Sequence, residues 1–258
     1  MGNRQTLFVS GVARSGTTAL VNVLNQHPRI LVGTERFFGR IKNQTLTQDM
    51  FAREAFLFPK RERSESQGFH LDGQDLVRKF NCATAIGDKF PGLYRHFDYM
   101  FDTFPEATHI YIFRNPFSVL ESFEARKERA GDNWSRGWRA GLEEWNESLG
   151  KVAALPDDRL EKFLFLPYED VLSSAERMNL IFAGLGLHGL PAQSFEPIIQ
   201  TFRELALRKG KRRERMRREV GRSANWAAYA RISDLADAQA ARLREQVALD
   251  AGQRIAGE

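Results

Sequence analysis

The sequence predicts an α/β fold in which helices flank both faces of a parallel sheet. Short apolar segments alternate with segments whose apolar residues repeat at helical spacing, the pattern of a parallel sheet with crossover helices. A glycine-bounded turn joins the first apolar segment to the first helical one. A chain of 258 residues, 42% hydrophobic and 28% charged, suits one globular domain of this class. We therefore expect residues 1–258 to form a single domain.

The strands are predicted from uninterrupted apolar segments, which are typical of parallel strands covered on both faces. Sites in such sheets lie at the carboxyl ends of the strands, so functional residues should follow these segments directly. The predicted strands are residues 6–10, 83–87, 109–113 and 163–166.

The helices are predicted from apolar residues three and four positions apart. A proline suits the first turn of the segment that begins at Pro116. The predicted helices are residues 16–26, 116–127, 171–185 and 235–247. A further stripe at helical spacing could be a stacking surface or part of the core, and we favour core packing. It consists of Trp134, Trp138, Leu142, Trp145 and Leu149.

The chain lacks sequence signals for membrane insertion or secretion. No apolar run approaches the roughly 18 residues of a spanning helix, and the first predicted strand begins within a few residues of Met1. We therefore expect no signal peptide, lipid anchor or transmembrane segment. Cys82 is the only cysteine, so the chain cannot form an internal disulfide. These features favour a cytoplasmic location.

The positive charge is concentrated in one segment. The net charge is +5, yet residues 208–222 alone hold nine basic residues against Glu214 and Glu219. Such a segment can be a solvated face, a mobile part of the chain, or a surface for nucleic acid or anionic lipid. Composition alone leaves these interpretations open.

The most informative segment is residues 7–18, in which an apolar strand, a turn bounded by Gly11 and Gly16, and a helix follow one another. Successive backbone N–H groups in such a turn converge on a phosphate, and the start of the helix adds partial positive charge. The segment therefore predicts a P-loop-type sheet. The alternative is an ordinary tight turn that uses both glycines as hinges.

The loop differs from that of the nucleoside triphosphatases. The Gly11-x4-Gly16 spacing matches their phosphate loop, but Thr17 stands where that motif requires lysine. A kinase also needs an acidic residue on a later strand to hold magnesium, whereas residues 110–113 lead directly into Arg114. A nucleotide-dependent kinase is therefore the weaker alternative.

Two motifs carry a resemblance to a known family. The run from Gly11 to Leu20, followed by Leu24-Asn-Gln-His-Pro28, resembles the 5′-phosphosulfate loop of the PAPS-dependent sulfotransferases, especially the bacterial and protein-tyrosine branches. The segment from Phe113 to Ser122 resembles that family's 3′-phosphate motif, with Arg-x-Pro and a serine eight residues after the arginine. PAPS is 3′-phosphoadenosine 5′-phosphosulfate.

Shorter matches extend the resemblance along the chain. Asp88-Lys-Phe-Pro91 resembles the family's Lys-x-Pro element and Pro167-Tyr-Glu-Asp-Val171 its Tyr-Glu-Asp element. Arg208-Lys-Gly210 is similar to an Arg-Lys-Gly element, and Gly221-Arg-Ser-Ala-Asn-Trp226 to a late segment with serine and tryptophan. The resemblance implies an enzyme that moves a sulfuryl group from PAPS to a hydroxyl or amine by in-line displacement without a metal.

The resemblance also implies which residues bind the donor. Arg14 would stabilise the departing phosphate, since guanidinium is always charged and forms strong hydrogen bonds. Backbone amides and hydroxyls of the loop would hold the 5′-phosphate, and Arg114 with Ser122 would hold the 3′-phosphate. Tyr168 would lie near the adenine or be buried behind its strand. The implied binding residues are Arg14, Ser15, Gly16, Thr17, Thr18, Arg114, Ser122, Tyr168 and Arg222.

The acceptor's proton requires a base, and the resemblance implies Glu35, which lies twenty-one residues after Arg14. The alternative for Glu35 is a surface acid paired with Arg36. Lys89 and Ser223 would donate to the sulfuryl oxygens, although Lys89 could also be a solvated structural lysine. His27 ends a predicted helix before a proline, where a capping or packing role suits it better than catalysis.

Two further segments are predicted to lie around the site, one on the acceptor side and one as a lid. Residues 36–80 contain seven phenylalanines and are predicted to lie on the acceptor side, though some of these rings must fill the core. Residues 203–226 are predicted to form a basic lid, with a solvated helix as the alternative. The acceptor itself stays unidentified, whether small molecule, carbohydrate, lipid or peptide, and exposed phenylalanines would favour a homodimer. We expect no nucleic-acid partner, since a binder that uses only a basic surface needs no anion cradle.

Overall fold

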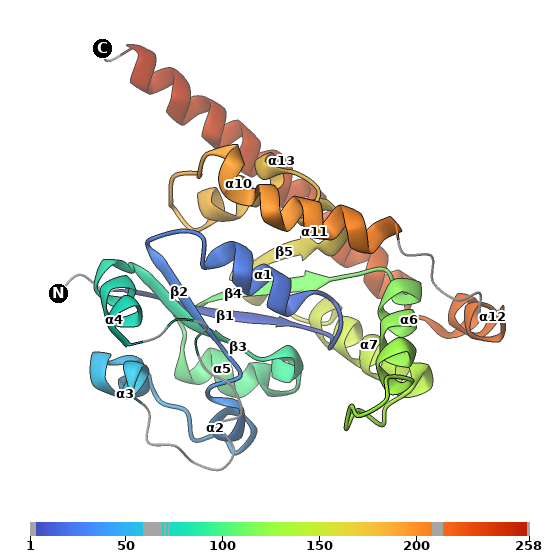
Figure 1. The fold of residues 1–258 in the computed structure, drawn as a ribbon. Helices are drawn as coiled ribbons and strands as arrows, with labels where there is room; N and C mark the ends of the chain where they lie inside the picture. Colours follow the sequence, from blue (N-terminus) through green and yellow to red (C-terminus); the bar gives the residue numbers. More distant parts are fainter. Residues whose placement is uncertain (1–3, 59–68, 70, 72, 208–213, 257–258) are drawn as a thin grey trace.

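The computed structural model describes residues 4–58, 69, 71, 73–207 and 214–256. Its centre is a parallel sheet of five strands in the order β2-β3-β1-β4-β5 (Figure 1). The strands are β1 (Gln5–Gly11), β2 (Ile30–Thr34), β3 (Ala85–Lys89), β4 (Thr108–Phe113) and β5 (Phe163–Pro167). The parallel sheet is confirmed, and three strands lie within one residue of their predicted bounds, whereas β3 begins and ends two residues later than the predicted 83–87. The edge strand β2 was missed.

The helices follow the predicted alternation with adjusted boundaries. The segment predicted as one helix over 171–185 divides because Ser174 accepts a hydrogen bond from the Arg177 amide and starts a new helix there. The α-helices are α1 (Thr17–Leu24), α2 (Phe38–Lys42), α3 (Arg53–Leu57), α4 (Gly73–Cys82), α5 (Phe97–Thr103), α6 (Pro116–Lys127), α7 (Trp138–Ala153), α8 (Asp157–Leu160), α9 (Tyr168–Val171), α10 (Ala175–Gly184), α11 (Glu196–Leu207), α12 (Glu214–Ser223) and α13 (Trp226–Ala256). The 3-10 helices among the described residues are η1 (Gln48–Phe51), η2 (Pro91–His96) and η3 (Ala192–Phe195).

Helices cover both faces of the sheet, as predicted. On one face, Leu7, Val9 and Ile112 of the strands pack with buried residues of α1 and α10. On the other face, Phe8 and Tyr111 pack with buried residues of α5, α7 and α13. The two cores arise because alternate residues of a strand point to opposite faces. The carboxyl ends of the strands stay between these layers, where α1 and α6 begin (Figure 1).

The aromatic residues mostly fill the core. Trp145 is buried and its ring lies 5.7 Å from that of Tyr229, whereas Trp134 and Trp138 are half-buried at the edge of the same cluster. Core packing of the tryptophan stripe is thus confirmed. Within residues 36–80, four phenylalanines are buried in a core cluster that includes Phe8, and Phe58 is exposed. The buried four are Phe37, Phe51, Phe56 and Phe80.

Each edge strand is covered by one side-chain amide. Asn25 donates from Nδ2 to the Val32 carbonyl and accepts from the Val32 amide through Oδ1, each at 2.9 Å. On the opposite edge, Gln239 of α13 donates to the Phe163 carbonyl at 2.7 Å and accepts from the Phe165 amide at 2.9 Å. These amides satisfy strand groups that would otherwise offer a template for pairing with another chain.

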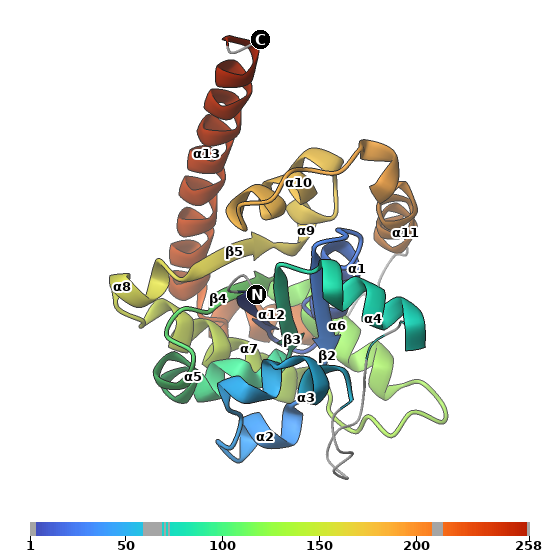
Figure 2. The ribbon, with the colours of Figure 1, turned by 90° about the vertical axis from the view of Figure 1, so that its left-hand side faces the viewer.

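The longest helix, α13, packs along β5, α7 and α10 and then projects beyond the rest of the fold (Figures 1 and 2). It contains the predicted helix over 235–247. Within the part of the chain that the structure describes, no helix combines the length and apolar character that crossing a bilayer requires.

Candidate active site

The phosphate loop between β1 and α1 is held in shape by glycine and by Ser15. Gly11 has a φ of 152°, and a Cβ there would lie 2.3 Å from the Ile112 carbonyl oxygen. Ser15 is buried, and its hydroxyl lies within hydrogen-bond distance of the carbonyls of Val12 (2.6 Å) and Ile112 (3.2 Å). The Ser15 amide also donates to the Val12 carbonyl at 3.0 Å. Ser15 therefore fixes the loop, which differs from the expectation that its hydroxyl faces a phosphate.

The remaining loop residues form the start of α1. Gly16 precedes the helix with a φ of 101°, and a Cβ there would lie 2.2 Å from the Tyr168 ring. The amides of Thr17 and Thr18 open the helix, where N–H groups have no intrahelical partner. Thr17 is buried and Thr18 is exposed. The loop thus keeps the geometry of an anion cradle, and Tyr168 closes one side of it.

Arg14 lies at the tip of the loop, in a left-handed backbone conformation with a φ of 70°. Its Nε donates to the Ser122 hydroxyl of α6 at 3.0 Å. Partial burial lowers the pKa of Arg14, and the positive charges of Arg126, Arg129 and Arg114 lower it further. Several guanidinium groups that repel one another in this way form a site where an anion would be stabilised.

Arg114 follows β4 and meets the loop from its other side. Its guanidinium lies 4.0 Å from the centroid of the Tyr168 ring, and its Nε is 3.6 Å from Glu169 Oε1. Trp145 donates from Nε1 to the Arg114 carbonyl at 3.0 Å and so fixes the backbone there. The structure thus brings together Arg14, Ser122, Arg114 and Tyr168, which were predicted from three separate segments.

Glu35 and Lys89 form a second group at neighbouring strand ends. Lys89 donates from Nζ to Glu35 Oε1 at 2.7 Å, and the Glu35 amide donates to the Lys89 carbonyl at 2.8 Å. The Lys89 side chain is 3% exposed, so the alternative of a solvated lysine is wrong. Glu35 pairs with Lys89 and is 26% exposed. Its φ is 52°, a conformation that costs about 1–2 kcal/mol outside glycine.

Among the described residues, no hydrogen bond or ion pair joins Arg222 or Ser223 to these groups. Arg222 and Ser223 are exposed at the end of α12, and the Ser223 carbonyl accepts from Asn146 of α7. The helix lies beside α6, where Arg217 pairs with Glu121 at 3.3 Å (Figure 1). Residues 208–213 of the predicted basic lid, with the Arg-Lys-Gly element, lie outside the described residues. Lid closure and the roles of Arg222 and Ser223 therefore stay predictions.

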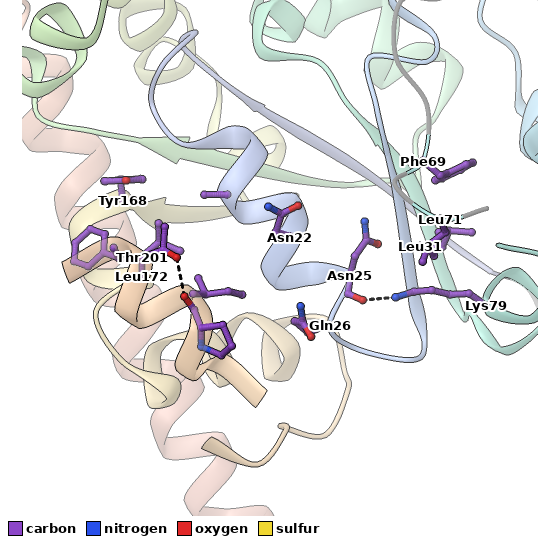
Figure 3. A pocket seen from close by; sticks show the side chains of 14 residues that line it. Asn22, Asn25, Gln26, Leu31, Phe69, Leu71, Lys79, Tyr168, Leu172 and Thr201 are labelled. Atoms are coloured by element: carbon purple, nitrogen blue, oxygen red, sulfur yellow. Dashed lines mark hydrogen bonds between the residues drawn. The ribbon is translucent and has the colours of Figure 1, made fainter. Parts of the chain in front are cut away.

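A groove of about 430 Å³ runs from Tyr168 across the outer face of α1 (Figure 3). Tyr168 and Phe202 of α11 form one end, with ring centroids 5.6 Å apart. Polar side chains of α1 and of the two residues that follow it line the middle, and Lys79 of α4 lies at the far end. The lining residues from α1, from the two positions after it and from α11 are Ala19, Asn22, Asn25, Gln26, Pro197, Ile198, Thr201 and Phe202. None was predicted, because the groove exists only where helices distant in sequence meet.

His27 lies away from these groups, as a packing role requires. Its side chain is buried against the Phe182 ring, with centroids 4.9 Å apart, and its Nδ1 accepts from the Arg29 amide at 3.1 Å. Among the residues that the structure describes, no three His, Cys, Asp or Glu side chains gather as a metal site would need.

Comparisons with known proteins agree with the motifs. A model of the Sulfotransferase family matches residues 6–188. The nodulation protein NoeE of Sinorhizobium fredii is 29% identical over 128 residues, which are 46% of this chain and 30% of that protein. Protein-tyrosine sulfotransferase 1 of Danio rerio is 25% identical over 178 residues, 66% of this chain and 50% of that protein. The matches thus span at most half the length of these relatives.

A solved sulfotransferase from Alicyclobacillus acidocaldarius superimposes with a TM-score of 0.47 and 18% identity, covering 80% of this chain and 97% of the other. The family model carries the assignment, because it spans both the phosphate loop and the 114–122 motif. The chain belongs to the sulfotransferase family.

Proposed function

We propose that this chain transfers a sulfuryl group from PAPS to a hydroxyl or amine acceptor. The observation that carries the proposal is the hydrogen bond between Arg14 and Ser122, which joins the 5′-phosphosulfate loop to the 3′-phosphate motif. A nucleotide with phosphates at both positions would bridge these two elements. The Glu35–Lys89 pair at the neighbouring strand ends supplies the remaining groups that the reaction needs.

The donor would occupy the loop and the adjoining groove. The amides at the start of α1 would hold the 5′-phosphate, and Arg114 with Ser122 would hold the 3′-phosphate. The adenine would lie at the Tyr168 end of the groove, next to Phe202 (Figure 3). Binding of the donor in this position would depend on Gly16, because any side chain there would collide with the Tyr168 ring.

Arg14 would stabilise the departing phosphate. As the bond between sulfur and the bridging oxygen breaks, negative charge grows on the 5′-phosphate, and a guanidinium at the tip of the loop neutralises it. Guanidinium groups thus provide the positive charge that magnesium provides in kinases, and the proposed reaction uses no metal. The hydrogen bond to Ser122 orients Arg14 before the donor binds.

Glu35 would take the proton of the acceptor. Lys89 bonds to Oε1, which leaves Oε2 of Glu35 to receive that proton while the acceptor oxygen or nitrogen attacks sulfur. Lys89 lies at the end of β3 beside the loop, where its ammonium group would also face the sulfuryl oxygens. In this proposal Arg14 would act on the leaving-group side of the sulfur and Glu35 on the acceptor side, as in-line displacement requires.

We also propose where in the cell the reaction takes place. A chain whose only cysteine is Cys82 is suited to a reducing compartment, and we place the reaction in the cytoplasm. The acceptor class stays unassigned. Incubating cell extracts with labelled PAPS and purified protein would identify the product that receives the label.

Nucleotide binding tests the proposal directly. We expect 3′-phosphoadenosine 5′-phosphate (PAP) to raise the melting temperature in the presence of EDTA, because a ligand that binds only the folded state stabilises it. ATP should raise it much less, since it lacks the 3′-phosphate that Arg114 would hold. An equal response to ATP, or a response to PAP that needs magnesium, would contradict the proposal.

A further inference from the structure

Asp88 is a buried charged residue beside the proposed active site, and the reaction outlined above does not use it. Its side chain is 1% exposed and lies on β3, directly before Lys89. Its Oδ1 accepts a hydrogen bond from the Arg36 amide at 3.3 Å, and its Oδ2 accepts one from the Phe37 amide at 3.0 Å. Both amides belong to the residues that follow Glu35.

The sequence around Asp88 makes room for this contact. Gly33 is its register partner on β2, and a Cβ at Gly33 would lie 3.0 Å from Asp88 Oδ1 and 2.5 Å from Arg36 Cδ. Burial raises the pKa of Asp88 to about 6, while the hydrogen bond from the Phe37 amide and the charge of Arg36 act in the opposite direction. A carboxylate is therefore kept here at a cost in desolvation that a hydrophobic side chain would avoid.

The turn that Asp88 holds is the one that orients Glu35. Glu35 has a φ of 52°, and a residue stays in that region only where its surroundings impose it. Lys89 fixes Glu35 itself, through its carbonyl and its ammonium group. Asp88 fixes the next two peptide groups. Two adjacent residues of β3, whose side chains point to opposite faces of the sheet, thus hold the turn at 35–37.

We infer that Asp88 is a positioning residue for sulfuryl transfer, and that its carboxylate holds the turn that aims Glu35 at the acceptor. This inference rests on the proposed function, in which Glu35 is the base. Asp88 touches neither donor nor acceptor and acts only through the backbone of residues 36 and 37.

The experiment compares Asp88→Asn with Ser148→Ala. Asparagine keeps the size of the side chain but replaces one acceptor oxygen with an NH₂ group, which cannot accept a hydrogen bond. Ser148 is the matched control, because it is also buried and its hydroxyl bonds to Tyr111 at 2.7 Å, away from the turn. Gly33→Ala serves as a second variant, since its Cβ would displace Asp88 and Arg36 without altering either residue.

Hydrogen exchange measures the protection of the amides in the turn at 35–37 and does not require the sulfuryl acceptor to be known. In Asp88→Asn and Gly33→Ala we expect the amides of Arg36 and Phe37 to exchange about tenfold faster, the factor expected for one lost charge-assisted hydrogen bond. Exchange within β1 should stay unchanged in both, and Ser148→Ala should leave the turn unchanged. Unaltered exchange at 36 and 37 in the Asp88→Asn and Gly33→Ala variants would overturn the inference.

Kinetics then separate positioning from simple destabilisation. We expect Asp88→Asn to lower kcat about 100-fold, as misplacement of a catalytic group by about 1 Å does, with KM for PAPS unchanged. Combined with Glu35→Gln it should cost nothing more, because it acts through Glu35. A further loss in the double variant, or an equal loss in Ser148→Ala, would overturn the inference. If wild type neither binds PAP nor transfers sulfate, the proposed function fails, while the exchange result still decides what Asp88 does to the turn.

Discussion

Buried polar side chains at the carboxyl ends of the strands are hydrogen-bonded, whereas a buried histidine in the amino half of the sheet is not. At the carboxyl ends, Ser15, Asp88 and Lys89 are all buried, and each makes hydrogen bonds. In the amino half, His109 of β4 is also fully buried, yet neither ring nitrogen has a hydrogen-bond partner among the described residues. Four phenylalanine rings surround it: Phe8, Phe97, Phe101 and Phe163.

Burial of polar side chains positions site residues at the carboxyl ends of the strands, but it has no such effect around His109. Burying a polar group costs free energy unless it is hydrogen-bonded, and at the carboxyl ends those bonds position Arg14 and Glu35 in left-handed backbone conformations. His109 avoids the larger cost of a buried charge by staying neutral, since burial lowers its pKa to about 3. Substitutions at the carboxyl ends should therefore alter the reaction, and substitutions around His109 should alter stability.

The largest expected effect is that of Glu35→Gln. Losing the base should reduce the rate of sulfuryl transfer about 1000-fold, within the range for general-base catalysis. PAP should still raise the melting temperature as it does in wild type, because Glu35 hydrogen-bonds to Lys89 and the proposal assigns the phosphates to other residues. The measurements are transfer of labelled sulfate to an acceptor found by screening, and thermal shift with PAP.

Glu147→Gln is the matched control, since it breaks a surface ion pair with Arg95 by the same change of side chain. It should leave the transfer rate unchanged. Undiminished transfer by Glu35→Gln would remove Glu35 as the base, and an equal loss in both variants would place the effect in stability.

The elements that were predicted correctly are those whose signal is local in the sequence. The phosphate loop and the segment after β4 each combine an apolar strand, a turn and a helix start within about a dozen residues. For the first of these segments the sequence also predicts an anion cradle, because closely spaced glycines before a helix are what an anion-binding turn requires. That the two segments meet through Arg14 and Ser122 follows from the parallel order of β1 and β4.

The remaining features depend on contacts between distant segments. β2 was missed because its uninterrupted apolar run is only three residues long, from Ile30 to Val32, before Gly33. Ser15 could face either a phosphate or the loop's own carbonyls, and the sequence does not distinguish these. Asp88 was noted only as the neighbour of Lys89, because its partners lie more than fifty residues away.

His109 provides the next test, through the pH dependence of stability. Its folded-state pKa lies below the ordinary 6.5, so the unfolded chain takes up a proton first and stability falls as pH drops from 6.5 toward 3. His109→Leu, a substitution close in volume, removes this loss. Relative to wild type it should gain about 2 kcal/mol between pH 7.5 and pH 5 in the free energy of unfolding by urea.

Asp88 would act in the opposite direction, since its pKa is raised from 3.8 to about 6 and its contribution to stability is lost as pH rises through that range. Wild type should therefore show a shallower slope between pH 4 and 6 than His109 alone would give. Phe101→Leu, in contact with His109, is the control and should shift stability equally at both pH values. A pH-independent effect of His109→Leu would mean that the imidazole is already protonated or solvated in the folded chain.

The smallest expected effect concerns the edge of the sheet, where Asn25→Ala should change stability and aggregation. Asn25→Ala removes both hydrogen bonds to Val32 and should lower the free energy of unfolding by about 1 kcal/mol, since water replaces the lost partners. Asn179→Ala is its matched control, because Asn179 makes the same pair of bonds to Leu190, which belongs to no strand. Both variants should lose similar stability in urea, yet only Asn25→Ala should aggregate faster, as light scattering would record, because it alone exposes a strand edge. Equal aggregation of the two would mean that Asn25 contributes hydrogen bonds and does not protect the edge.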